Sequence, residues 1–91
     1  AVDDALLREL PKLFPAPDFH HPMDPSFEHT KPEARPENME RFNKFKALRN
    51  ARLLTTEDGL DLYYIAEQSK SVRLTPLGQF YWHLADRKRI R

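Results

Sequence analysis

Cysteine is absent from the 91 residues of this chain, and glycine occurs only twice. Without cysteine there is no disulfide, and no thiolate for catalysis or metal binding. Two glycines are too few for a glycine-rich loop that cradles phosphate, and no serine lies in a nucleophile elbow. Long apolar runs are also missing, which argues against a membrane span. The sequence therefore predicts a non-enzymatic protein with no cofactor, no small-molecule substrate and no membrane partner.

The first residues bear on the origin of the chain. The sequence begins at Ala1 rather than Met, so it is compatible with a processed or excised segment. No signal-peptide pattern is present, which favours a cytoplasmic location. Hydrophobic residues make up 40% and aromatic residues 11% of the chain, enough for one small globular domain with a modest core.

The net charge of +1 conceals four blocks of alternating sign. Residues 1–30 carry two bases against six acids, a net charge of −4, and residues 57–70 carry one base against four acids, a net charge of −3. Residues 31–56, with seven bases and three acids, and residues 71–91, with five bases and one acid, each carry +4. A strong nucleic-acid binder has a more uniformly basic footprint. Charge alone therefore selects no class of partner.

Apolar spacing predicts two helices in the first part of the chain. The stretch "ALLRELPKLF" (residues 5–14) has helical periodicity, and Pro11 is expected to kink that helix or end it near Leu10. A second helix is predicted from Pro36 to about Arg52. Its apolar residues recur at every third position, so the stripe drifts around the axis; they are Phe42, Phe45, Leu48 and Ala51.

A β-hairpin is predicted over residues 60–75. Apolar residues alternate with others from Leu60 to Ala66, which is a strand pattern, and Val72 and Leu74 alternate in the returning strand. Asp58-Gly59 is a strong turn dipeptide, so Leu53–Thr56 is expected to pair backwards as a short strand. The expected sheet is a two-stranded hairpin or a three-stranded meander.

The joint "LTPLG" (residues 74–78) predicts the start of a last helix. Thr75 is expected to cap it and Pro76 to be its first residue. A glycine in the first turn lowers helix stability, so Gly78 indicates close packing on a neighbouring element. The helix has an apolar face with the spacing i, i+3, i+4, i+7, made of Leu77, Phe80, Tyr81 and Leu84. Three of these side chains, Leu77, Phe80 and Leu84, are expected to be buried against the hairpin.

Six of the eight prolines lie in residues 15–36, where regular structure is not expected to persist. Apolar side chains are nevertheless spaced along this segment. We expect it to be irregular but docked over the body of the domain by Phe19 and Phe27. The histidines His20, His21 and His29 lie among acids here, but their spacing matches no known zinc ligand set, so no metal is predicted.

The second half of the chain resembles the winged-helix domains of bacterial regulators of the MarR and PadR kinds. The matching pieces are a helix ending in Leu53-Leu54, a β-wing, and the step Leu74-Thr75-Pro76-Leu77-Gly78 that opens the last helix. The resemblance covers roughly half of the chain, and the proline-rich segment occupies the place of the short helix and tight turn before the recognition helix. It implies a small α+β domain of winged-helix type.

The resemblance implies two functions. As a DNA-binding module, the chain would use its second helix as the recognition helix and the wing to contact the backbone. The candidate contacts are Asn43, Lys46, Arg49 and Asn50 on the helix, and Lys70 and Arg73 on the wing. The alternative is a winged-helix module that binds a protein, including a second copy of itself as a homodimer. Large aromatic residues too numerous for one small core favour this alternative, and the candidate interface residues are Tyr63, Tyr81 and Trp82.

Overall fold

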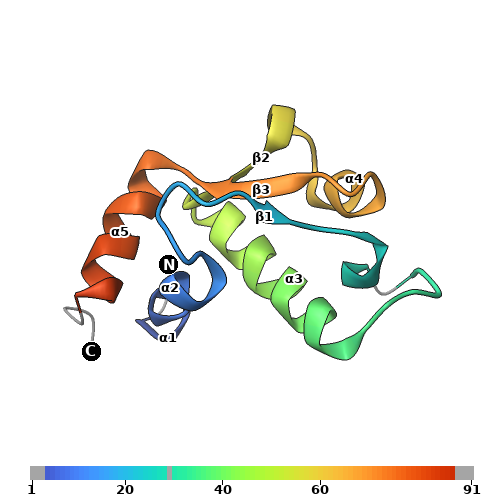
Figure 1. The fold of residues 1–91 in the computed structure, drawn as a ribbon, viewed down its shortest axis with the longest axis horizontal. Helices are drawn as coiled ribbons and strands as arrows, with labels where there is room; N and C mark the ends of the chain where they lie inside the picture. The colour runs from blue at the N-terminus through green and yellow to red at the C-terminus, as the bar shows by residue number, and fades with distance from the viewer. Residues whose placement is uncertain (1–3, 29, 88–91) are drawn as a thin grey trace.

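The computed structural model describes residues 4–28 and 30–87 of the chain. The elements along them are α1 (Asp4–Arg8), α2 (Leu10–Leu13), β1 (His21–Pro22), the 3₁₀ turn η1 (Pro25–Phe27), α3 (Pro36–Asn50), β2 (Leu54–Thr56), the 3₁₀ turn η2 (Glu57–Gly59), α4 (Leu62–Glu67), β3 (Ser71–Leu74) and α5 (Pro76–Asp86). The strands form one antiparallel sheet in the order β1–β3–β2. In Figure 1, α3 runs beneath the sheet, and α4 and α5 lie at opposite ends of the molecule. The predicted α+β class is confirmed.

Pro11 interrupts the first helix, as predicted, but the helix resumes instead of ending. α1 stops at Arg8 and α2 starts at Leu10, so Pro11 is the second residue of the new helix. A proline is tolerated there because first-turn N–H groups have no partner within a helix. The buried side chains of this pair of helices, Leu7, Leu10 and Leu13, join the core.

α3 is the long helix predicted from Pro36, and its core face is the drifting stripe. Phe42, Phe45 and Leu48 are all buried. The helix ends in a Schellman motif, in which the N–H of Leu53 bonds to the carbonyl of Leu48 at 2.9 Å and Arg52 adopts a left-handed conformation with φ 64°. This turn directs the chain from α3 into β2.

The proline-rich segment is short on regular structure and docked on the body, as predicted. Met23 and Phe27 are buried and Phe19 is half-buried against the core. His21 is also buried, with its ring edge-on to neighbouring phenylalanines; these are Phe14, Phe19, Phe27 and Phe45. The segment contributes β1, which pairs with β3 through His21 and Val72 and so completes the sheet.

The predicted hairpin over residues 60–75 is wrong in its first half. β3 is present, with Val72 and Leu74 buried, and β2 pairs with it, but residues 62–67 form the helix α4. The Asp61 carboxylate caps this helix by accepting from the N–H of Tyr64 at 2.9 Å. Leu62, Ile65 and Ala66 then face the core at i, i+3 and i+4. The alternating apolar residues fit both a strand and this helical spacing, and the Asp61 cap favours the helix.

α5 begins as predicted but faces the other way. The Thr75 hydroxyl accepts from the N–H of Gly78 at 3.0 Å, and Pro76 is the first helical residue. The predicted burial of Leu77, Phe80 and Leu84 is wrong, since Leu77 is 48% and Phe80 58% exposed, and Leu84 is only half-buried.

The inward face of α5 is instead built on its glycine. A Cβ on Gly78 would lie 2.0 Å from the carbonyl oxygen of Leu53, so only glycine lets the helix approach the chain this closely. Trp82, one turn further on, is buried on the same face. The predicted close packing at Gly78 is confirmed, and this contact is what rotates the predicted apolar face to the surface.

Candidate interaction surfaces

Four of the predicted nucleic-acid contacts lie on the C-terminal half of α3. Asn43 and Asn50 are exposed, while Lys46 and Arg49 are half-buried. Lys46, Arg49 and Asn50 line a shallow depression of about 260 Å³ together with residues of the α4 start, Asp61, Leu62 and Tyr63. The structure therefore brings these helix residues together on one surface.

Lys46 is engaged with aromatic rings on this surface. Its Nζ lies 5.3 Å from the ring centroid of Phe42 and 5.5 Å from that of Tyr63, within cation–π range. It also donates to the Tyr63 hydroxyl at 3.4 Å. A lysine held over two rings is less free to reach out to a phosphate than one extended into solvent.

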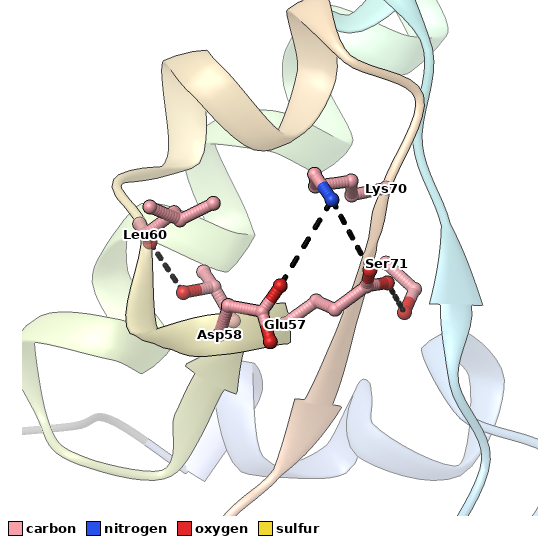
Figure 2. A network of polar contacts seen from close by, with 6 residues as sticks. Glu57, Asp58, Leu60, Lys70 and Ser71 are labelled. Atoms are coloured by element: carbon pink, nitrogen blue, oxygen red, sulfur yellow. Dashed lines mark hydrogen bonds and ion pairs between the residues drawn. The ribbon is translucent and has the colours of Figure 1, made fainter.

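The predicted wing contact Lys70 lies in a network of polar contacts at the base of the β2–β3 connection (Figure 2). Its Nζ is 3.5 Å from Glu57 Oε2 and 3.9 Å from Asp58 Oδ2. The Ser71 hydroxyl donates to Glu57 Oε1 at 3.1 Å, and this bond, with the weaker help of Lys70, lowers the pKa of the Glu57 carboxyl. Two carboxylates thus already balance the ammonium group of Lys70. The network also links η2 to the residues that follow α4.

Arg73 lies away from the α3 contacts. It is exposed in β3 between the buried Val72 and Leu74, so its side chain leaves the opposite face of the sheet from the core. Its cross-strand neighbour is Thr55. The six predicted nucleic-acid contacts therefore do not form one continuous surface.

The predicted protein-interface residues are also divided. Tyr63 belongs to α4, and it is 43% exposed like its neighbour Tyr64. Tyr81 and Trp82 belong to α5 at the other end of the molecule (Figure 1). Trp82 lies in the core, where its indole N–H donates to the carbonyl of Phe14, so a surface role does not fit it.

Four apolar side chains lie at the surface of α5, and the sequence predicts burial for three of them, Leu77, Phe80 and Leu84. We call this set the α5 patch; it consists of Leu77, Phe80, Tyr81 and Leu84. The rings of Phe80 and Tyr81 contact each other edge to face, with centroids 5.5 Å apart. Tyr81 and Leu84 are half-buried, and Leu77 and Phe80 are exposed. Helical spacing places the four on one side of α5.

Lysines elsewhere on the described surface are largely paired. Lys44 contacts Glu9 at 2.6 Å and Lys12 contacts the same carboxylate at 3.1 Å, and the Lys44 bond is the main reason that the pKa of Glu9 is lowered. Lys31 contacts Glu67 at 3.7 Å. These pairs reduce the positive field available to an anionic partner.

Residues 4–28 and 30–87 contain no group of three or more histidines and acids placed to hold a metal ion. His21 is committed to the aromatic cluster, and its ring nitrogens contact the Pro22 carbonyl at 2.8 Å and Arg41 Nη1 at 3.4 Å. His29 lies outside the described residues. Over the same described ranges, no helix is long and apolar enough to cross a bilayer.

Comparison of the chain with models of protein families, with curated proteins and with solved structures finds no match in any of the three.

Proposed function

We propose that this chain is a non-enzymatic module of winged-helix type that binds another protein through the α5 patch. The observation that carries the proposal is the exposure of Phe80 (58%) and Leu77 (48%) on one helix face. Burying one such side chain stabilises by roughly 1.5–3 kcal/mol, which a domain of 91 residues can ill spare. Contiguous exposed apolar side chains are typical of protein interfaces.

The order of the elements supports the winged-helix part of the proposal. A short helical turn, η1, precedes the long helix α3, and the chain then passes through Leu53-Leu54 into β2. β3 returns beside β2 and leads through Thr75-Pro76 into the last helix. Two features depart from the pattern. The connection from η1 to α3 is longer than a tight turn, and η2 with α4 replaces an extended wing.

DNA binding through α3 is the second candidate. It is supported by the exposed amides of Asn43 and Asn50, which can bond to base edges, with Lys46 and Arg49 beside them. Acidic residues on the same helix, Glu37 and Glu40, oppose it because they are exposed and would repel phosphates. The ion pairs of Lys70 also remove a predicted backbone contact.

One pair of variants tests both candidates. A photoactivatable phenylalanine analogue replaces either Phe80 in α5 or Asn43 in α3, and the full chain is irradiated in the cells that make it. We expect the analogue at position 80 to give a discrete protein adduct that nuclease leaves intact, and the analogue at position 43 to give none. A nuclease-sensitive adduct at position 43 supports DNA binding instead. Failure to form any protein adduct at position 80 contradicts the proposal.

A further inference from the structure

An arginine lies near each end of α5. Arg87 follows Leu84 by three residues and Phe80 by seven, which places it on the patch side of the helix end. Arg52 lies beside the first turn, because its backbone carbonyl accepts from the Thr75 hydroxyl at 2.7 Å. Both side chains are exposed, and neither forms an ion pair within the described parts of the chain. Their charges are therefore available to a partner.

Within α5 itself, no acidic residue lies on the patch side to balance these arginines. Asp86 is the one acid in the helix, and it is two residues beyond Leu84, about 200° around the axis. The helix is only about 16 Å long at 1.5 Å per residue. Arg87 is three residues beyond Leu84, a helical rise of about 5 Å, which is less than one Debye length of roughly 10 Å.

From this arrangement we infer that the partner of the α5 patch is an acidic amphipathic segment of another polypeptide. Its apolar side chains cover Leu77, Phe80 and Leu84, and its aspartates or glutamates face Arg52 and Arg87. The inference rests on the proposed function and adds the chemistry of the partner. Complementary charge at the rim would direct which segments associate and how they align, while the apolar centre would supply most of the affinity.

A second copy of this chain is a poorer occupant of the patch. Symmetric dimers pair the same surface of both copies. Two α5 helices that pack antiparallel bring Arg87 of one copy toward Arg52 of the other, and two that pack parallel bring each arginine toward its own counterpart. Since both ends are basic, either arrangement places like charges together at the rim. An acidic partner has no such repulsion.

The test uses two synthetic helical peptides with identical leucines at i, i+3, i+4 and i+7. Their polar positions are all glutamate in one peptide and all lysine in the other. Each is titrated into the full chain at low and at high salt, and backbone NMR shifts report both the affinity and the site. We expect the acidic peptide to bind at α5 about tenfold more tightly at low salt, because two rim contacts change from attraction to repulsion in the basic peptide. High salt should remove most of the difference.

Three variants locate the effect. Phe80→Ser should abolish binding of both peptides, whereas Arg87→Gln should weaken only the acidic one, by several-fold. Arg52→Gly should act like Arg87→Gln, and glycine suits the left-handed backbone at this position, so folding is preserved. A matched control, Asn43→Gln on α3, should leave both affinities unchanged.

The outcomes separate this inference from the proposed function. Equal affinities for the two peptides, or no binding of either, overturn the acidic partner, whereas the protein adduct at position 80 decides the proposed function independently. Sedimentation gives a further check. A dimer at micromolar concentration that Phe80→Ser dissociates would overturn the inference in favour of a second copy.

Discussion

The indole N–H of Trp82 donates a 2.6 Å hydrogen bond to the backbone carbonyl of Phe14, which lies 68 residues earlier in the chain. Phe14 is fully buried and Trp82 is 8% exposed, so the bond is in the core. It fastens α5 to the end of α2 and satisfies a carbonyl that water cannot reach. Together with the contact at Gly78, it sets which side of α5 faces the core.

Replacing Trp82 with phenylalanine tests this bond. We expect Trp82→Phe to lower the free energy of unfolding by about 2 kcal/mol, because the buried Phe14 carbonyl loses its donor and part of the ring volume is left empty. Urea titration followed by circular dichroism gives the value. Tyr64→Phe is the matched control, since it removes a polar atom from a side chain that is 43% exposed, and it should change stability by less than about 0.5 kcal/mol. Equal losses in both variants would show that the hydrogen bond does not matter.

Gly78 is expected to tolerate no side chain. In Gly78→Ala the new Cβ would lie 2.0 Å from the Leu53 carbonyl oxygen, which belongs to the backbone and cannot rotate away. We expect a loss of about 3 kcal/mol in urea titration, against the gain that alanine usually gives inside a helix. Gly59→Ala provides the comparison. Position 59 has open space but φ +70°, so a loss of only about 1 kcal/mol is expected. A neutral or stabilising Gly78→Ala would mean that α5 does not rest on Leu53.

Replacing Arg52 with glycine is expected to stabilise the fold. Its φ of 64° is left-handed, which disfavours a residue with a Cβ by roughly 1–2 kcal/mol. Glycine adopts this conformation freely but loses more chain entropy on folding, so we expect Arg52→Gly to raise the free energy of unfolding by about 0.5–1 kcal/mol. Arg41→Gly, in the middle of α3, should instead be destabilising by about 1 kcal/mol. Thermal melts of the two variants distinguish these signs.

His21 should make the protein sensitive to mild acid. Its pKa is lowered from the ordinary value of 6.5, mainly because burial disfavours the charged ring, and Arg41 adds to the effect. As the pH falls below 6.5, His21 therefore becomes protonated in the unfolded chain while it stays neutral in the folded chain. The stabilisation is complete above pH 6.5 and is lost as the pH falls toward the lowered pKa.

Unfolding titrations across this pH range should show the slope directly. In His21→Leu the part of the slope that begins near pH 6.5 should disappear, whatever the variant's stability at neutral pH. His20→Ala removes the neighbouring exposed histidine and should leave the slope in place. Identical slopes in the wild type and His21→Leu would rule out His21 as the source.

Binding to random duplex DNA is expected to be undetectable at low salt. Many described lysines are already paired with carboxylates, and Lys46 is held over aromatic rings. Few lysines are then left to release counterions from DNA. Fluorescence anisotropy with a labelled duplex measures this. Binding that weakens steeply with salt, and that Lys46→Gln and Arg49→Gln reduce, would move DNA to the leading function.

Sequence patterns predicted the elements that are determined by residues close together in the chain. The cap at Thr75 with Pro76 and the stripe of Phe42, Phe45 and Leu48 each depend on neighbouring residues, and both are confirmed. α5 was different because it has apolar side chains on two sides. Periodicity predicts burial of the side with Phe80. The side that is actually buried is set by the close approach of Gly78 to the backbone of Leu53, and these two residues are distant in sequence.

The candidate site was predictable only in part for the same reason. Asn43, Lys46, Arg49 and Asn50 were correctly placed on one helix, since helix geometry follows from their spacing. The pairing of Lys70 with Glu57 was not, because it depends on how residues 57–70 fold back on themselves. The position of Arg52 and Arg87 near an exposed apolar surface was also not predictable, because it depends on which face of α5 is exposed.

The position of β3 has a consequence for synthesis of the protein. β3 is the middle strand, yet it follows both of its partners in the chain, with β1 some fifty residues earlier at His21–Pro22. Until Ser71–Leu74 has been made, β1 and β2 have no strand to pair with, and the phenylalanine cluster around His21 lacks the sheet that holds it. Assembly must therefore wait for the last quarter of the chain. Nascent chains stalled before residue 71 should be degraded readily by proteases, whereas chains released after α5 should resist them.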